Sequence, residues 1–248
     1  MPDQPAIDLA INTATTRRQW SLAQAIEGYA RAGITAVGPG REEVREMGPE
    51  RAARQISDAG LKVTGLCRAG LLSVLDEPQF HAALDDNRRA IDEAAALGAN
   101  VVVLVAGGLP NGVVELAAVR ERVAEGIAAL IPDAKAAGVR LGIEPLHPVY
   151  AADRCVINTL DQALDLCDSL DPDGDNGLGV IVDTYHVWWD PGLAKAVDRA
   201  APRTLGYHIN DWMSPQSDPL NDRGMMGDGA IDLVGITRLV RSAGITLT

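Results

Sequence analysis

The amino-acid sequence predicts a (β/α)₈ barrel, the TIM-barrel fold, with residues 1–248 forming one domain. Short runs of apolar and β-branched residues alternate with longer Ala-, Leu-, Arg- and Glu-rich segments whose apolar residues recur at helical spacing. Turns such as AGIT, AGLK and AGVR recur where a helix is expected to end on Gly and a strand to begin. Strands joined by single helices pair in parallel with right-handed crossovers, and eight such units close a barrel.

Eight strands are expected, each a short run of apolar and β-branched residues. They cover residues 6–15, 34–40, 61–67, 100–108, 139–145, 178–186, 204–211 and 245–248. The helices expected between them cover residues 21–33, 42–59, 78–97, 115–137, 158–170, 192–202 and 231–244. Ser21 is a suitable N-cap for the first helix, and Gly33 and Gly60 are expected to end the first and second helices.

An open, doubly wound sheet is the alternative architecture. Such sheets usually contain fewer units, and no GxGxxG sequence opens a helix in this chain. The eighth expected strand has only four residues, so the sequence predicts a barrel with a truncated eighth strand. We expect the sequence to be part of a longer chain, because an unclosed barrel would leave its first and seventh strands with exposed edges.

Composition and charge narrow the possible partners and location. The net charge of -12 is unfavourable for binding nucleic acid or an anionic membrane surface. No apolar run reaches 18 residues, so no membrane span is expected. The N-terminal MPDQPAID lacks the pattern of a secretory signal, and the three cysteines show no CxxC spacing. These features predict a cytoplasmic protein with reduced thiols.

The scarce histidines and tryptophans gather at the expected ends of strands. His147, His186 and His208 lie at or just after the fifth, sixth and seventh expected strands, and Trp188 and Trp212 lie close by. The carboxyl ends of the strands of a barrel converge on one mouth, where functional side chains collect. The tryptophans are typical of walls that stack on sugars, although a Trp beside a strand is as often a packing residue.

Glu144 and Asp183 each end an apolar strand. A buried carboxylate needs a partner or a metal ion, although either one alone could be a structural carboxylate and His208 a hydrogen-bonded core histidine. The three residues come from consecutive strands about 4.8 Å apart, so their side chains can meet. Two carboxylates and an imidazole suit a divalent ion, and Mn²⁺ is the first candidate, with Mg²⁺, Co²⁺ or Zn²⁺ as alternatives.

The motifs GIEPLH, VDTYHVWWDP, GYHINDW and RGMMGDGAID resemble those of the xylose-isomerase-like TIM-barrel superfamily. The strand rhythm extends this resemblance over nearly the whole chain. The superfamily includes sugar isomerases, ketose 3-epimerases, inosose-type dehydratases and endonuclease IV. The resemblance implies that Glu144, Asp183 and His208 hold the ion together with a Glu on the eighth strand, for which this sequence has no counterpart. It also implies that His186 and Arg223 contact the substrate.

The sequence EPLHP and the following YAADRCVINTLDQALDL look more like the catalytic subunits of bacterial C-glycoside deglycosidases and related 3-keto-glycoside lyases. Ketose 3-epimerases typically carry E-x-x-N-R at this place. In the lyases the ion polarises an oxidised sugar and a nearby His is the general base. The resemblance implies a small carbohydrate or glycoside as substrate, and either a homo-oligomer or a smaller second subunit as partner.

The predicted function is therefore metal-dependent β-elimination, or C-deglycosylation, of a 3-keto glycoside. Glu144 and His147 are the predicted catalytic residues, and His147 is the first candidate for the base because its ordinary pKa is close to neutral. His147 could instead be a loop residue packed between two prolines. Trp188, Trp212 and Asp211 are predicted to bind substrate, although Asp211 could merely cap a loop.

Three other functions are alternatives to elimination. A sugar isomerase or ketose 3-epimerase is the main alternative, because the same proton abstraction followed by reprotonation gives isomerisation. A non-catalytic barrel subunit is a remote alternative. An endonuclease is disfavoured, because the positions at which it needs further histidines offer Cys67, Arg68 and Ala106.

Overall fold

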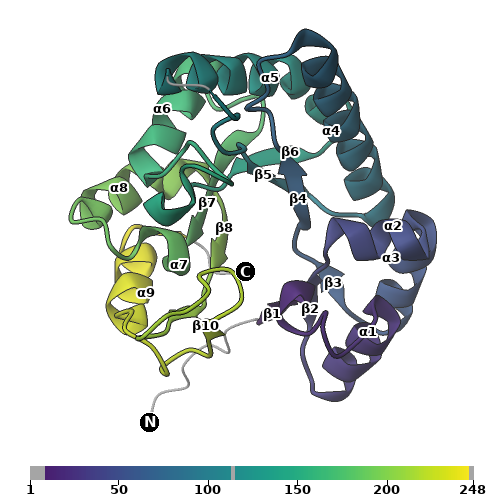
Figure 1. The fold of residues 1–248 in the computed structure, drawn as a ribbon. Coiled ribbons are helices and arrows are strands. Elements are labelled where there is room, and N and C mark those ends of the chain that lie inside the picture. The colour runs from purple at the N-terminus through teal and green to yellow at the C-terminus, as the bar shows by residue number, and fades with distance from the viewer. Residues whose placement is uncertain (1–8, 113–114, 246–248) are drawn as a thin grey trace.

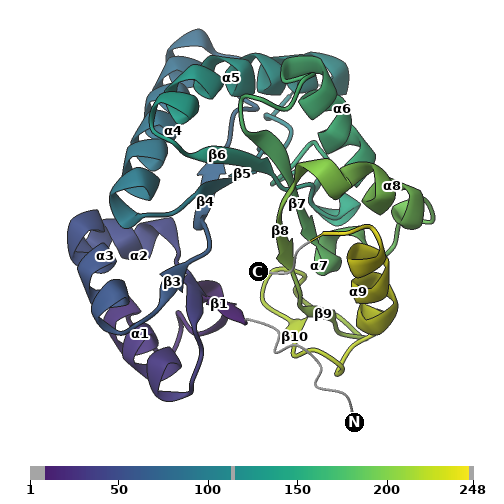
Figure 2. The same ribbon diagram turned by 180° about the vertical axis from the view of Figure 1, so that it is seen from behind.

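Parallel strands form the inner wall of the molecule and helices cover its outside (Figures 1 and 2). The computed structural model describes residues 9–112 and 115–245. The predicted TIM-barrel class is confirmed by the parallel pairing of consecutive strands around the wall.

The wall consists of two sheets that follow each other around the barrel. The first contains, in order, β1 (Ala10–Asn12), β2 (Ala36–Gly38) and β3 (Lys62–Val63). The second contains β4 (Leu66–Gly70), β5 (Val101–Val105), β6 (Arg140–Ile143), β7 (Leu178–Asp183) and β8 (Thr204–His208). In the described part of the chain, one parallel bridge, between Gly40 and Cys67, joins the sheets. The strand expected at 61–67 is therefore two short strands that pair on either side of a seam.

Helices follow the strands in the predicted order. They are α1 (Leu22–Arg31), α2 (Arg41–Met47), α3 (Pro49–Asp58), α4 (Glu77–Leu97), α5 (Leu116–Ala136), α6 (Leu160–Leu170), α7 (Thr184–Val187), α8 (Leu193–Ala200) and α9 (Leu233–Ser242). Short 3₁₀ turns are η1 (Thr13–Thr15), η2 (Pro148–Tyr150) and η3 (Ala201–Arg203). Ser21 caps α1 in a reciprocal capping box with Gln24, as its position before the helix predicts.

Other expected boundaries also need correction. The helix expected at 42–59 is two helices, because Gly48 adopts a φ of 89° and Pro49 starts a new helix there. The strand expected at 178–186 ends at Asp183, whose side chain caps α7, so His186 lies in that short helix. The strand expected at 204–211 ends at His208. It is followed by a hairpin of β9 (Asp211–Trp212) and β10 (Arg223–Gly224), which is absent from the expected elements.

Residues 246–248 of the eighth expected strand lie outside the described residues. Within residues 9–112 and 115–245, β1 pairs only with β2, and β8 pairs only with β7. Over the same ranges, no helix combines the length and the apolar composition needed to cross a bilayer.

Apolar residues divide between the two faces of the wall. Val101 and Val103 of β5 pack with Ile181 of β7 inside the barrel, next to Cys67 and Leu205. The alternate residues of these strands belong to the larger core between strands and helices. This alternation, with a period of two residues, sets which strand-end side chains point toward the barrel axis.

An ion-pair network built around the buried Arg41 joins α2 to α4. The Arg41 guanidinium is 7% exposed and donates to Glu93 Oε2 at 2.6 Å and to Asp86 Oδ2 at 2.6 Å. Arg45 contacts the same two carboxylates, but its side chain is 42% exposed. Burial alone would raise the pKa of Asp86, but the hydrogen bonds and charge of Arg41 lower it to about 2.

Replacing Arg41 with Ala is expected to lower the free energy of unfolding by about 3 kcal/mol, because Glu93 then stays buried with only a half-exposed partner. The matched change Arg45→Ala should cost less than about 1 kcal/mol, since exposed ion pairs contribute little. Urea unfolding at pH 7 measures both values. Equal losses in the two variants would contradict the role assigned to burial.

The depressed pKa of Asp86 gives a pH dependence with a defined sign. Its stabilisation is fully present above the unfolded-state pKa of about 4 and is lost as the pH falls toward 2. The stability difference between wild type and Arg41→Ala should therefore shrink between pH 5 and pH 2. Urea midpoints across this range measure the difference, and a gap that stays constant would show that the pair does not titrate.

Candidate metal centre at the barrel mouth

The three predicted metal ligands stand at or directly after the carboxyl ends of β6, β7 and β8. Each lies two residues beyond a position that faces the barrel interior; these positions are Gly142, Ile181 and Gly206. A Cβ on Gly142 would meet Ile181 Cδ1 at 2.7 Å, and one on Gly206 would meet the same atom at 3.1 Å. The two glycines therefore leave room for Ile181, and the pleat points the residues two places on toward the axis.

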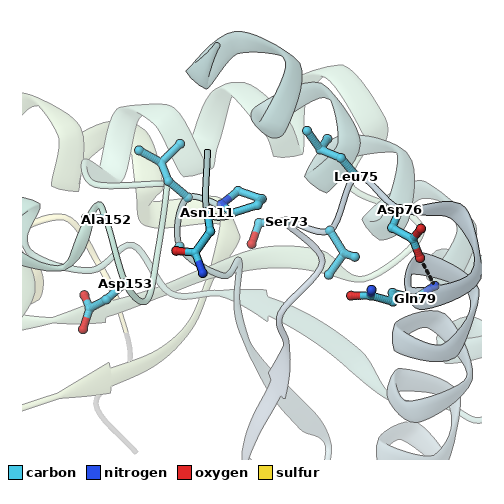
Figure 3. Close-up of a pocket in the computed structure, with 11 residues that line it drawn as sticks. Ser73, Leu75, Asp76, Gln79, Asn111, Ala152 and Asp153 are labelled. Atoms are coloured by element: carbon cyan, nitrogen blue, oxygen red, sulfur yellow. Dashed lines mark hydrogen bonds between the residues drawn. The ribbon is translucent and has the colours of Figure 1, made fainter. Parts of the chain in front are cut away.

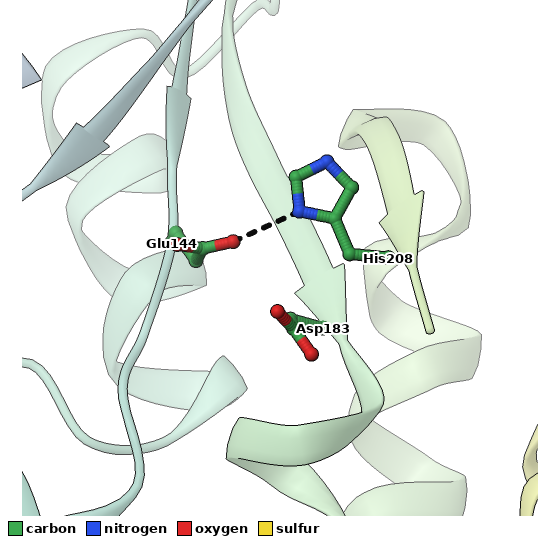
Figure 4. A group of neighbouring side chains, drawn as sticks. All are labelled: Glu144, Asp183 and His208. Carbon is green, nitrogen blue, oxygen red and sulfur yellow. Dashed lines mark hydrogen bonds and ion pairs between the residues drawn. The ribbon is translucent and has the colours of Figure 1, made fainter. Parts of the chain in front are cut away.

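Glu144, Asp183 and His208 meet there (Figure 4). His208 Nδ1 lies 3.0 Å from Glu144 Oε1, and one ligand atom from each residue lies within 4.8 Å of the others. Glu144 is 9% exposed, Asp183 is 4% exposed and His208 is half-buried. The structure thus brings together the three side chains that the sequence predicted as ligands.

The charges of this cluster suit a cation. Two carboxylates buried so close together repel each other and need compensation. Arg223 offers only part of it, because its Nη1 is 3.9 Å from Asp183 Oδ2. Burial by itself would lower the pKa of His208, but the hydrogen bond and charge of Glu144 hold it above the ordinary value. Two oxygens and one imidazole nitrogen form a donor set that fits a divalent ion such as Mn²⁺.

His186 is held as a neutral hydrogen-bond donor next to the cluster. Burial is the main reason why its pKa falls to about 3, although the charge of Asp183 opposes this shift. Its Nδ1 accepts the backbone N–H of His147 at 3.2 Å, so the ring proton lies on Nε2. That nitrogen is 3.4 Å from Arg223 Nη2 and 3.9 Å from Asp183 Oδ2. Two donors, from His186 and Arg223, therefore face one small region.

His147 lies in the loop after β6 in a fixed orientation. Its Nδ1 accepts the backbone N–H of Val149 at 3.1 Å, and burial lowers its pKa. The ring lies 4.6 Å from the Trp212 ring and 5.7 Å from the Trp189 ring. In its neutral form His147 therefore carries its proton on Nε2. To accept a proton at Nδ1, the ring would first have to give up the bond to Val149.

Arg223 reaches the cluster from the hairpin of β9 and β10. Its guanidinium lies 4.3 Å from the centre of the Tyr185 ring. The Tyr185 hydroxyl donates to the carbonyl of Pro219 at 2.5 Å, so α7 and the hairpin loop are tied together. The predicted substrate residues His186 and Arg223 are thus brought together with the metal ligands, although contact with a substrate stays a prediction.

The predicted aromatic wall is a connected group. The Trp212 ring lies 4.8 Å from the Tyr185 ring and 5.7 Å from the Trp188 ring, in addition to its contact with His147. Much of the Trp212 surface is therefore used within the protein. Stacking of Trp188 or Trp212 on a sugar stays a prediction.

Asp211 has a different environment from the other predicted substrate residues. It is fully buried, and its two carboxylate oxygens accept hydrogen bonds from four backbone N–H groups between residues 212 and 231. These bonds lower its pKa, although burial alone would raise it. These four hydrogen bonds are those of a residue that caps a loop, which is the alternative role considered for Asp211.

Three further residues lie near the cluster but are not among the predicted site residues. Asn210 donates from Nδ2 to Asp183 Oδ1 at 3.3 Å, and Tyr185 supports Arg223. Tyr150 is buried with its ring 5.8 Å from His186, and its hydroxyl makes no hydrogen bond within the described part of the chain. Tyr185 and Asn210 stand inside the motifs VDTYH and GYHINDW, so proximity to the ligands was an available signal. Nothing in the sequence singles out Tyr150.

A pocket of about 570 Å³ lies between the N-terminus of α4 and the loops after β5 and η2 (Figure 3). Ser73, Gln79, Leu109, Asn111 and Asp153 are among its lining residues. None of the three candidate ligands lines it, so this pocket is separate from the cluster.

Comparison with known proteins extends these observations. The crystal structure of protein SMc04130 from Sinorhizobium meliloti 1021 is 52% identical, covers 97% of this chain and 87% of its own, and has a TM-score of 0.93. The IOLI protein with a bound zinc atom is 20% identical, over 96% of this chain and 86% of that chain, with a TM-score of 0.81.

A third similar structure is 3-keto-D-glucoside 4-epimerase, YcjR, from E. coli. It is 19% identical over 98% of this chain and 90% of that chain, with a TM-score of 0.79. At this identity the likeness to it and to IOLI shows the fold. No curated protein matches the sequence. The family model described as xylose isomerase-like TIM barrel matches residues 26–247. The chain therefore belongs to the xylose isomerase-like TIM barrel family.

Proposed function

We propose that this protein is a divalent-metal-dependent enzyme that removes a proton next to the carbonyl group of a sugar, and that its reaction is β-elimination from a 3-keto glycoside. The observation that carries the proposal is the convergence of Glu144, Asp183 and His208 within 4.8 Å at the barrel mouth. The EPLHP segment, which places a His three residues after the first ligand, favours elimination. A structural relative named as a 3-keto-D-glucoside 4-epimerase supports an oxidised sugar as the substrate class.

The residues around the cluster offer the contacts that such a substrate needs. Bound by Glu144, Asp183 and His208, a divalent ion would polarise the carbonyl group and stabilise negative charge as the neighbouring C–H loses its proton. The N–H groups of His186 and Arg223 face one region and can donate to one substrate oxygen. Carbohydrate hydroxyls supply acceptors of this kind.

The tautomer of His147 suggests how the proton moves. We assign the proton-accepting role to Glu144, whose carboxylate takes the proton from the carbon next to the carbonyl. The electron pair of that C–H bond forms a C=C bond as the bond to the aglycone breaks. His147, which carries its proton on Nε2, stabilises the departing group by a hydrogen bond. The proton held by Glu144 then passes to the aglycone, so no charge is left on the protein.

Aldose–ketose isomerisation or ketose 3-epimerisation is the second candidate. It shares proton removal by Glu144 and differs in returning the proton to carbon. The structural similarity to an L-ribulose 3-epimerase, 21% identical with a TM-score of 0.79, supports epimerisation as the second candidate reaction. A cytoplasmic location and a homo-oligomer or smaller second subunit stay predictions.

The wild-type protein is expected to bind one Mn²⁺ ion per chain in isothermal titration calorimetry. Asp183→Asn should weaken this binding by about 100-fold or more, because even changes around a ligand cost about 10- to 100-fold. Asp153→Asn is the matched control, since this carboxylate is 63% exposed and lies outside the cluster. Absence of a stoichiometric ion in the wild type would favour the non-catalytic barrel instead.

Incubating the Mn²⁺-loaded protein with a 3-keto C-glycoside and, separately, with free ketoses tests the reaction. Release of the aglycone, followed by liquid chromatography, is the expected result. Glu144→Gln should slow it at least about 100-fold, as should His147→Ala, while His147→Gln keeps a donor and should retain more activity.

Two results would contradict these expectations. Formation of an epimer from a ketose without release of aglycone would establish the second candidate. Equal activity of His147→Ala and wild type on the glycoside would remove His147 from the mechanism. The Asp153→Asn variant again serves as the control, because its change lies outside the cluster.

A further inference from the structure

The carboxylate of Asp211 organises the segment that carries Arg223. Asp211 Oδ1 accepts the N–H groups of Trp212 at 2.9 Å and Ile231 at 3.0 Å. Asp211 Oδ2 accepts those of Gly227 at 2.9 Å and Gly229 at 3.0 Å. Four charge-assisted bonds to one buried carboxylate offset the cost of burying it and fix the path of the backbone around it.

The glycines of this segment fit the carboxylate closely. A Cβ on Gly229 would stand 2.5 Å from Asp211 Oδ1 and 2.5 Å from the carbonyl oxygen of Trp212. Gly227 has a φ of 98°, which side-chain-bearing residues rarely adopt. The segment RGMMGDGAID therefore wraps around Asp211 because glycine occupies these positions.

The same arrangement determines where two residues of the proposed site lie. Asp211 pairs with Gly224 and Trp212 pairs with Arg223 in the antiparallel hairpin. Arg223 lies against Tyr185 and His186, and the Trp212 ring lies against His147. In the described residues the Asp211 carboxylate accepts hydrogen bonds only from backbone N–H groups, and at zero exposure it has no surface for a ligand.

We propose that Asp211 is a positioning residue: its carboxylate gathers four backbone N–H groups and thereby holds Arg223 over Tyr185 and beside His186 for contact with substrate. The effect on substrate rests on the proposed function, because it requires that Arg223 contacts the sugar. The effect on the position of Arg223 requires only the bonds described above.

The first test examines the segment without any substrate. Asp211→Asn replaces one acceptor oxygen by an NH₂ group, which cannot accept hydrogen bonds from the backbone N–H groups that face it. Hydrogen exchange followed by mass spectrometry should show faster exchange at residues 225–231 than in wild type. Arg223 should also react at least several-fold faster with phenylglyoxal. The control Asp228→Asn changes an exposed carboxylate of the same segment and should leave both rates at the wild-type level.

A second variant keeps the Asp211 carboxylate and disturbs the backbone that packs against it. Gly229→Ala places a Cβ against Asp211 Oδ1 and should give the same pattern of exchange and labelling. Circular dichroism verifies that each variant remains folded. Mn²⁺ titration verifies that the metal site is intact, because in the part of the chain that the structure describes Glu144, Asp183 and His208 make no hydrogen bond to Asp211 or to residues 225–231. Unchanged labelling of Arg223 in both folded variants would overturn the proposal.

The last test asks whether the hydrogen bonds to Asp211 affect substrate binding. With a 3-keto C-glycoside, Asp211→Asn should raise KM about 10-fold with little change in kcat, and Arg223→Ala should add little in the Asp211→Asn background. Fully additive losses would overturn the positioning role. If wild type acts on neither the glycoside nor free ketoses, the proposed function fails, whereas exchange and labelling still decide whether Asp211 positions Arg223.

Discussion

The structure at the mouth of the barrel depends on the burial of two carboxylates at the ends of neighbouring strands. Glu144 and Asp183 are nearly inaccessible to water, and the chain supplies one imidazole and part of one guanidinium to balance them. An arrangement of this kind is costly unless a cation completes it. Two neighbouring features balance part of the negative charge: the guanidinium of Arg223 near Asp183 and the hydrogen bond of His208 to Glu144. His186 does not, because burial keeps it neutral despite the charge of Asp183.

Hydrogen bonds from backbone N–H groups orient the rings of His186 and His147. The N–H of His147 fixes the tautomer of His186, and the N–H of Val149 fixes that of His147. These bonds determine which nitrogen can donate or accept a proton, which composition and spacing alone do not show. The ordinary pKa of histidine predicts a base at His147, whereas the bond from Val149 leaves Nε2 as its free N–H donor; a role in catalysis stays a prediction.

The barrel and its three candidate ligands were predictable because they depend on periodic patterns. An apolar strand with a period of two residues that ends in Glu144 or Asp183 indicates both the strand and the direction of the side chain. The break at Gly48 and the split between β3 and β4 were less accessible, since they depend on local backbone conformation. The hairpin of β9 and β10 was missed because strands of two residues give almost no periodic signal. The buried environment of Asp211 depends on residues up to 20 positions away in the sequence.

The seam between β3 and β4 separates two parts of the wall, and the candidate ligands lie on one side of it. One bridge, between Gly40 and Cys67, joins them, and all three candidate ligands extend from the larger sheet. The first three strands and their helices are coupled to that sheet mainly through the helix layer, where Arg41 of α2 pairs with Asp86 and Glu93 of α4. A change that loosened this layer would therefore tilt one part of the wall against the other without unpairing β6, β7 and β8, the strands at whose ends the three side chains converge.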